Sequence, residues 1–198
     1  MIEYGVARFI LPGEAESGDQ HLVCSNQDGI LLAVIDGIGH GGVAAKAAAI
    51  AASVLKIGAS QPIISLVEQC HEALRSTRGV VLSIASIDVS HGMMTWLGVG
   101  NVQGILMRAA AGKGNAQETL LLRGGVVGSQ LPPLQAFVLP IAHGDTLFFA
   151  TDGIRGAFAE SLSARENPQR AADRILEKFC NGNDDALVLA VRLTGTLA

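Results

Sequence analysis

The sequence predicts an α+β domain built mainly from antiparallel β-sheets, with helices packed on the outside. Predicted strands are followed by two helices, a run of strands, one helix and a last strand, which is not the alternation that builds a parallel sheet. Hydrophobic residues make up 49% of the 198 residues, enough for a sizeable core. The 24 glycines predict many tight turns between the strands.

The N-terminal part of the chain predicts three strands. Residues 3–11 form the first, and residues 21–24 and 29–35 form a hairpin through the turn signal NQDG at 26–29. The second hairpin strand contains ILLAVI, which is apolar throughout, so we expect it to be buried. It leads directly into DGIGHGG at 36–42.

Two helices are predicted next. The alanines of 43–57 give this segment a high helix propensity, and 62–76 has a proline in its first turn and apolar residues at helical spacing. Segment 43–57 is the longest apolar one, but Lys46 and Lys56 interrupt it and it is shorter than the ~20 residues of a membrane span. The N-terminus also lacks the basic region of a signal peptide. We expect a cytoplasmic protein with one domain, 1–198.

The second half of the chain returns to strands. The predicted elements are strands at 80–89, 93–99, 102–108, 118–123, 136–139 and 146–151, a helical piece at 154–160, a helix at 168–180 and a strand at 186–193. The loop Ala110–Gln117 is the stretch that we expect to be flexible.

Charge and cysteine content exclude several classes of function. The net charge is −4 and no cluster of five lysines or arginines occurs, which argues against nucleic acid as a partner. Cys24, Cys70 and Cys180 are widely spaced and show no C-x-x-C pattern. They are interpreted as free thiols in a reducing compartment.

The placement of the aspartates carries the functional hypothesis. Asp36 and Asp152 each end a hydrophobic strand and precede a glycine, Asp184 and Asp185 open the last strand, and Asp19 precedes the strand at 21–24. Clustered carboxylates need a cation, and Mg²⁺ and Mn²⁺ take carboxylate and water ligands. Two such ions can activate a bridging water and clamp a phosphoryl group.

A single Asp-Gly pair has a simpler interpretation. Each pair also fits an ordinary turn, and this is the interpretation that we favour for Asp28-Gly29. The metal hypothesis depends on the combination of two pairs at strand ends with a third acidic pair.

Together these motifs resemble the metal-dependent protein phosphatases (PPM, protein phosphatase type 2C), especially their bacterial sporulation and stress-response branch. The resemblance rests on SGD at 17–19, DGIGHG at 36–41, TDG at 151–153 and DD at 184–185. RG at 78–79 and GVGNV at 98–102 look most like the RsbX type, which acts on the stressosome, a bacterial stress-signalling complex.

The resemblance implies a fold, cofactors and roles for individual residues. It implies two packed antiparallel sheets flanked by helices, with two Mn²⁺ or Mg²⁺ ions at one end. Asp36 would bridge both ions and Gly37 would lend its carbonyl, while Asp152 and Asp184 would be further ligands and Asp19 an outer acid that orients waters. Asp36 and Asp152 are the proposed catalytic pair. The implied reaction is hydrolysis of phosphoserine or phosphothreonine on phosphorylated stressosome scaffold proteins.

Three assignments stay open at this point. Asp185 is an alternative to Asp184, because Leu187 stands where the family often has threonine or serine. His40 is either a general acid or a residue that shapes its loop or hydrogen-bonds an aspartate. Arg8 is the nearby candidate for the phosphate-binding arginine that eukaryotic members carry near the N-terminus.

Two alternative functions were weighed. The pattern G-x-G-x-x-G at 37–42, after a strand and before a helix, matches a dinucleotide-binding fingerprint. Against it, Asp36 would stand beside the pyrophosphate, and a second helix follows where that fold needs a strand. The other alternative is a phosphatase-like module that only binds its partner. Loss of Asp36 or Asp152 would mark it, and both are present.

Overall fold

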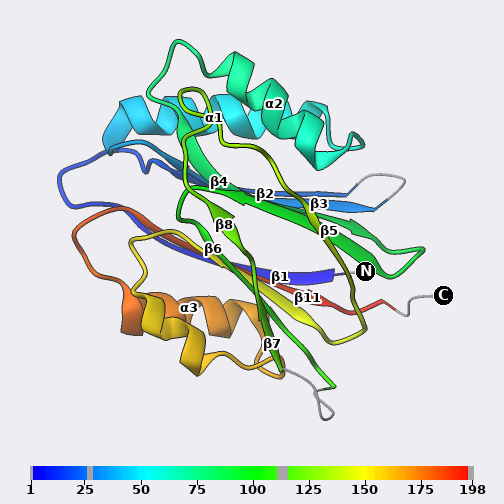
Figure 1. The fold of residues 1–198 in the computed structure, drawn as a ribbon. Coiled ribbons are helices and arrows are strands. Elements are labelled where there is room, and N and C mark those ends of the chain that lie inside the picture. The colour runs from blue at the N-terminus through cyan, green and yellow to red at the C-terminus, as the bar shows by residue number, and fades with distance from the viewer. Residues whose placement is uncertain (1, 26–28, 111–115, 196–198) are drawn as a thin grey trace.

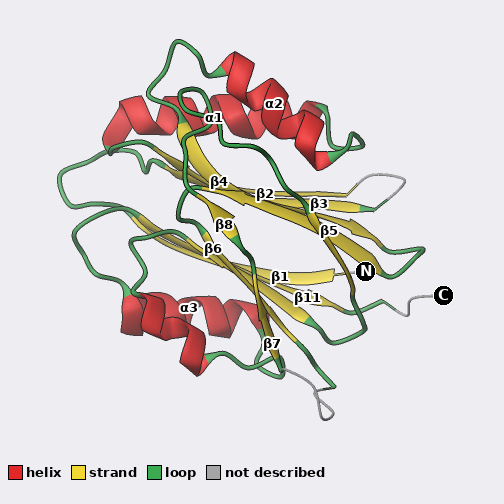
Figure 2. Cartoon of the chain, viewed as in Figure 1, coloured by secondary structure: helices red, strands yellow, loops and turns green. Residues whose placement is uncertain are grey.

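Two β-sheets lie face to face in the structure, a computed structural model that describes residues 2–25, 29–110 and 116–195 (Figure 1). Helices α1 (Gly41–Ile57) and α2 (Ile63–Ala73) cover the outer face of one sheet and α3 (Pro168–Phe179) covers the outer face of the other (Figure 2). The predicted α+β sandwich flanked by helices is confirmed. Most of the turn signal at 26–29 and residues 111–115 of the predicted flexible loop lie outside the described residues.

Antiparallel pairing dominates both sheets. In spatial order, the first sheet contains β1 (Ile2–Phe9), β11 (Ala186–Leu193), β10 (Thr146–Ala150), β6 (Gln103–Met107) and β7 (Gln117–Thr119). The second contains β2 (Asp19–Ser25), β3 (Ile30–Gly37), β4 (Val80–Asp88), β5 (Met93–Val99) and β8 (Leu122–Arg123), with β9 (Phe137–Pro140) also paired to β5.

Strand β3 pairs antiparallel with both β2 and β4, so no parallel βαβ unit surrounds 37–42. The dinucleotide-binding alternative is therefore wrong.

Three apolar layers hold the sandwich together. One lies between the sheets, one lies between the second sheet and helices α1 (Gly41–Ile57) and α2 (Ile63–Ala73), and one lies between the first sheet and α3 (Pro168–Phe179). Strand β3 contributes to two of them, because Leu32 and Val34 face the other sheet while Leu31 and Ile35 face the helices. This alternation explains why its sequence is apolar throughout, as predicted for a buried strand.

Two predicted elements have a different form in the structure. The segment 118–123 is not one strand but two, β7 in the first sheet and β8 in the second. Leu120 stands at the crossing, where its side chain is buried between the sheets and its N–H donates to the carbonyl of Gly104 at 2.8 Å. The helical piece predicted at 154–160 is a 3₁₀ helix, η1 (Gly156–Ser161).

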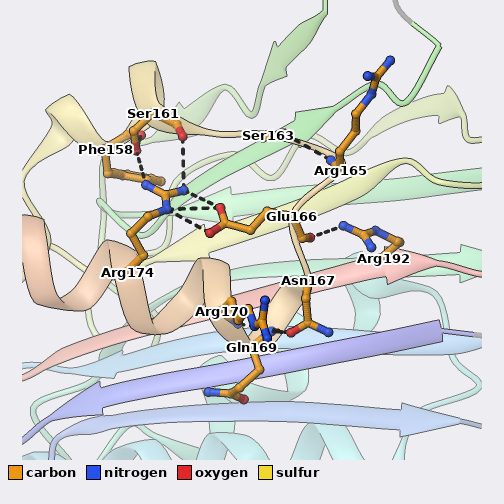
Figure 3. Close-up of polar contacts among 10 residues, drawn as sticks. All are labelled: Phe158, Ser161, Ser163, Arg165, Glu166, Asn167, Gln169, Arg170, Arg174 and Arg192. Atoms are coloured by element: carbon orange, nitrogen blue, oxygen red, sulfur yellow. Dashed lines mark hydrogen bonds and ion pairs between the residues drawn. The ribbon is translucent and has the colours of Figure 1, made fainter.

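Charged contacts hold the connection between η1 and α3 (Figure 3). Arg174 donates to both carboxylate oxygens of Glu166, with 2.7 Å between Nη2 and Oε2, and its Nη1 donates to the Ser161 hydroxyl at 3.1 Å. Arg192 donates to the backbone carbonyl of Glu166. The side chain of Asn167 caps α3 by accepting from two backbone N–H groups. Glu166 therefore binds one arginine through its carboxylate and another through its backbone carbonyl.

No helix among the described residues is long and apolar enough to cross a membrane.

Candidate metal centre

Three of the predicted aspartates line one pocket at an end of the sandwich. Asp36 comes from the end of β3, Asp152 follows β10 and Asp184 precedes β11. The pocket has a volume of about 420 Å³, and its wall is completed by Ile38, Gly39, Val81, Gly100, Asn101, Gly124 and Gly125. Because β10 and β11 are antiparallel neighbours, the end of one and the start of the other meet at this edge.

Asp19 stands behind these residues. It lies directly opposite Asp36 in the register of β2 and β3, and its side chain is 2% exposed. The hydroxyl of Thr151 donates to Asp19 Oδ2 at 2.7 Å and accepts from the Leu187 N–H at 2.8 Å. The leucine that departs from the family pattern thus contributes its backbone to the position of Asp19.

Burial and mutual repulsion disfavour charge on these carboxylates. Burial raises the pKa of Asp36 to about 8, with repulsion from the neighbouring aspartates as the second cause. Burial likewise raises the pKa of Asp19 to about 7, against the effect of its hydrogen bond from Thr151. The pKa of Asp184 is raised mainly by burial, with Asp152 adding to the rise. Among the described residues, no lysine or arginine forms an ion pair with these acids.

Asp185 has a different environment from Asp184. Its side chain is 3% exposed, and its two carboxylate oxygens accept hydrogen bonds from the N–H groups of Leu11 at 2.9 Å and Gly18 at 2.7 Å. It therefore fastens both ends of the loop between β1 and β2. The geometry favours Asp184 over Asp185 as the acid that faces the pocket.

Two asparagines that the sequence hypothesis did not include fix Asp152. The amide of Asn101 donates to Asp152 Oδ2 at 2.8 Å, and the amide of Asn181 donates to the Asp152 carbonyl at 3.2 Å. Asn101 follows Gly100, whose φ of +96° suits a residue without a side chain. The only sequence signal for Asn101 was its place in the motif GVGNV.

Close backbone packing explains the two glycines that follow aspartates. A Cβ on Gly37 would lie 2.3 Å from the carbonyl oxygen of Ala44 in α1, and one on Gly153 would lie 2.0 Å from the carbonyl oxygen of Asp185. Any other residue would push α1 or β11 away from the pocket. Asp36-Gly37 ends strand β3 and is not a turn, whereas Asp152-Gly153 lies in a turn in which the Ile154 N–H donates to the Thr151 carbonyl at 3.0 Å.

The donor set fits hard divalent cations. Only oxygen donors gather among the aspartates, which suits Mg²⁺ or Mn²⁺ rather than softer metals. Among the residues that the structure describes, no three acidic, histidine or cysteine side chains are grouped to hold one ion by themselves. Mg²⁺ is commonly bound by only one or two carboxylates and keeps several waters. The acids therefore fit ions that keep much of their hydration.

His40 contacts a neighbouring loop, and Arg8 lies at another pocket. His40 Nδ1 lies 2.5 Å from Glu14 Oε1, so the histidine contacts a glutamate of the β1–β2 loop rather than an aspartate. Its positive charge, when present, opposes the rise in the pKa of Asp184. Arg8 donates to His21 Nδ1 at 3.3 Å and lines a separate pocket of about 450 Å³, which does not include Asp36.

Comparisons with known proteins identify the family of the chain. The family described as "Stage II sporulation protein E (SpoIIE)" matches residues 26–194. "Phosphoserine phosphatase RsbX" of Bacillus subtilis (strain 168) is 31% identical over 94 residues, which are 48% of this chain. The matched stretch spans about half of that relative, 47% of its length.

Solved structures match over nearly the whole chain. One match is a chain from a structure of "the bacterial stressosome", described as "a modular system that has been adapted to control secondary messenger signaling". It is 32% identical to this chain, with a TM-score of 0.88, and the match covers 97% of this chain and 100% of that one. RsbX "in complex with magnesium" has 22% identity, a TM-score of 0.86 and coverage of 98% and 96%.

A more distant structure shares the fold and contains manganese. The catalytic domain of the serine/threonine phosphatase PstP "in complex with 2 Manganese ions" has 16% identity and a TM-score of 0.72, with coverage of 98% of this chain and 99% of that one. The family match covers most of the chain, and the fold is that of the PPM phosphatases. The chain therefore belongs to the SpoIIE family of PP2C-type phosphatase domains.

Proposed function

We propose that this chain is a metal-dependent protein serine/threonine phosphatase, and that residues 1–198 act as one phosphatase domain. The observation that carries the proposal is the pocket in which Asp36, Asp152 and Asp184 meet, with no lysine or arginine of the described chain paired to them. Such a site needs bound cations to keep its carboxylates ionised at neutral pH. Membership of the SpoIIE family and the likeness to RsbX support the reaction.

Each acid would have a distinct role in this mechanism. Asp36 would contribute to both of two Mn²⁺ or Mg²⁺ ions, with the carbonyl of Gly37 beside it, and Asp152 and Asp184 would complete the protein ligands. Asp19 would orient bound waters. When bound, the ions would lower the pKa of a water and offset charge on the phosphoryl oxygens. Asn101 holds the Asp152 carboxylate in one orientation, as partners of metal ligands commonly do.

The experiment is a metal-dependent turnover assay on a phosphoserine protein and on a chromogenic aryl phosphate. Chelated protein should be inactive, and added Mn²⁺ or Mg²⁺ should restore hydrolysis. Calorimetric titration should give a stoichiometry of two ions per chain. Full turnover in metal-free protein would refute the mechanism, and metal binding without turnover would favour the binding-module alternative.

We further propose that the partner is a phosphorylated stressosome scaffold protein. The RsbX likeness and the match to a stressosome structure support this. Metal-activated water discriminates little between phosphorylated side chains, so selectivity would come from docking of a folded partner around the pocket. The intact phosphorylated scaffold should have a much higher kcat/KM than a peptide carrying the same phosphosite at equal Mn²⁺. Equal values would refute docking and indicate a general phosphatase.

A further inference from the structure

One arginine side chain lies against the wall of the metal pocket. Gly39 is part of that wall, and a Cβ built on it would lie 2.8 Å from Nη1 of Arg78. The guanidinium therefore occupies the space that a side chain at position 39 would take. Gly39 has a φ of +97°, a conformation that also favours glycine. Both features leave room for Arg78 beside the acidic pocket.

The backbone that carries Arg78 is braced against the loop after Asp36. Thr77 donates from its hydroxyl to the Leu74 carbonyl at 2.8 Å and accepts from the Gly79 N–H at 3.0 Å. The N–H of Ile38 then donates to the Gly79 carbonyl at 3.1 Å. A change in the position of the segment 77–79 would therefore disturb the backbone two residues after Asp36.

The guanidinium of Arg78 is available to a ligand. Its residue is exposed, and no described carboxylate pairs with it. Arg75, three residues earlier, differs in this respect because it forms an ion pair with Glu72 at 3.2 Å. A planar guanidinium can donate two parallel hydrogen bonds to phosphate oxygens, and such charge-assisted bonds are stronger than neutral ones.

The negative charges of the pocket and of a phosphorylated substrate favour a cation beside the pocket wall. A phosphoserine side chain carries close to two negative charges at neutral pH. The described side chains that line the pocket include Asp36, Asp152 and Asp184 but no lysine or arginine. Arg78 lies beside Gly39 in the wall of this pocket and carries the charge that these acids lack.

We propose that Arg78 binds the phosphoryl group of the substrate at the rim of the metal pocket and positions it for attack by water. The proposal rests on the proposed phosphatase function. It gives to Arg78 the role that the sequence resemblance suggested for Arg8, which lines a different pocket.

The test compares Arg78→Ala and Arg78→Lys with Arg75→Ala, a matched control from the same connection. Inorganic phosphate is titrated calorimetrically into Mn²⁺-loaded protein, and kcat/KM is measured on the phosphoserine protein. Arg78→Ala should weaken phosphate binding and lower kcat/KM by ~10- to 100-fold, the loss expected for charge-assisted hydrogen bonds. Arg78→Lys should restore part of the loss, and Arg75→Ala should behave as wild type.

Two results would overturn the proposal. One is wild-type phosphate affinity in Arg78→Ala. The other is an equal loss of Mn²⁺ affinity in that variant, which would indicate a structural role. Phosphate binding is measured without turnover, so wild-type protein that binds phosphate through Arg78 but hydrolyses no phosphoprotein would refute the proposed function and leave Arg78 as a phosphate-binding residue only.

Discussion

The two ends of strand β10 carry aspartates in opposite environments. Asp145 directly precedes the strand. Asp19 of β2 lies near the other end, where it contacts Thr151. Both aspartates are 2% exposed. Asp145 accepts hydrogen bonds from Arg108 Nη1 at 2.8 Å and from the N–H groups of Ala109 and Ala142 at 2.9 and 3.1 Å. Asp19 accepts from the Thr151 hydroxyl and stands among other aspartates.

This contrast separates structural charges from functional ones. The carboxylate of Asp145 is neutralised within the fold, as is that of Glu166 in the cluster of Figure 3. The carboxylates around Asp36 repel one another, and within the described ranges no lysine or arginine forms an ion pair with them. A protein keeps such an arrangement where a ligand completes it, so the same Asp→Asn substitution should have opposite consequences at the two ends.

The largest expected effect is on turnover at the unpaired end. Asp36→Asn and Asp152→Asn each remove a charged oxygen ligand, and we expect kcat/KM to fall by at least ~100-fold at saturating Mn²⁺. Asp173→Asn, an exposed aspartate on α3, is the control and should keep wild-type turnover. Near-normal rates in either site variant would show that the metal site has been placed wrongly.

The second effect is on stability at the paired end. Asp145→Asn leaves Arg108 without one of its two carboxylate partners, the other being Glu118, and places an amide N–H₂ among N–H donors. Breaking a buried pair in this way typically costs ~3 kcal/mol or more of unfolding free energy. Calorimetry should show a clearly lower melting temperature. Below that temperature, kcat/KM should stay at the wild-type value, and a selective loss of turnover with unchanged stability would contradict the contrast.

The third effect is also on stability, but here the substitution should raise the melting temperature instead of lowering it. Burial raises the pKa of Asp36 from its ordinary 3.8 to about 8 in the fold, so its contribution to stability is lost as pH rises towards 8. The melting temperature of metal-free wild-type protein should therefore fall between about pH 5 and about pH 8. Asp36→Asn should reduce this fall and melt higher than wild type at the upper pH. Bound Mn²⁺ should stabilise wild type more than the variant. A lower melting temperature of metal-free Asp36→Asn at the upper pH would mean that the carboxylate is not repelled.

Sequence patterns located the strands and the acids that end them, because both depend on local hydrophobic runs. They placed Asn101 and Arg78 in motifs of the family resemblance but gave neither a role in the site, because the contacts of Asn101 with Asp152 and of Arg78 with Gly39 join segments distant along the chain. Nor could they decide whether Asp184 or Asp185 faces the pocket. The two acids are adjacent in the sequence, and Asp185 is held away by the N–H groups of Leu11 and Gly18 in another loop. The split of 118–123 depends on Leu120 entering the core between two sheets, which no local pattern reveals.

The smallest expected effect on turnover comes from the cysteines. A phosphocysteine mechanism needs a thiolate, and burial raises the pKa of Cys70 to about 12, so this thiol stays protonated at neutral pH. Cys24 and Cys180 are free thiols outside the pocket that contains Asp36. Cys24→Ser, Cys70→Ser and Cys180→Ser should all keep wild-type kcat/KM. Cys70→Ser should lower the melting temperature slightly, because its side chain packs in the layer between the second sheet and the helices. Loss of turnover in one correctly folded serine variant would mean that a thiol takes part in the reaction and that metal-activated water is not the sole nucleophile.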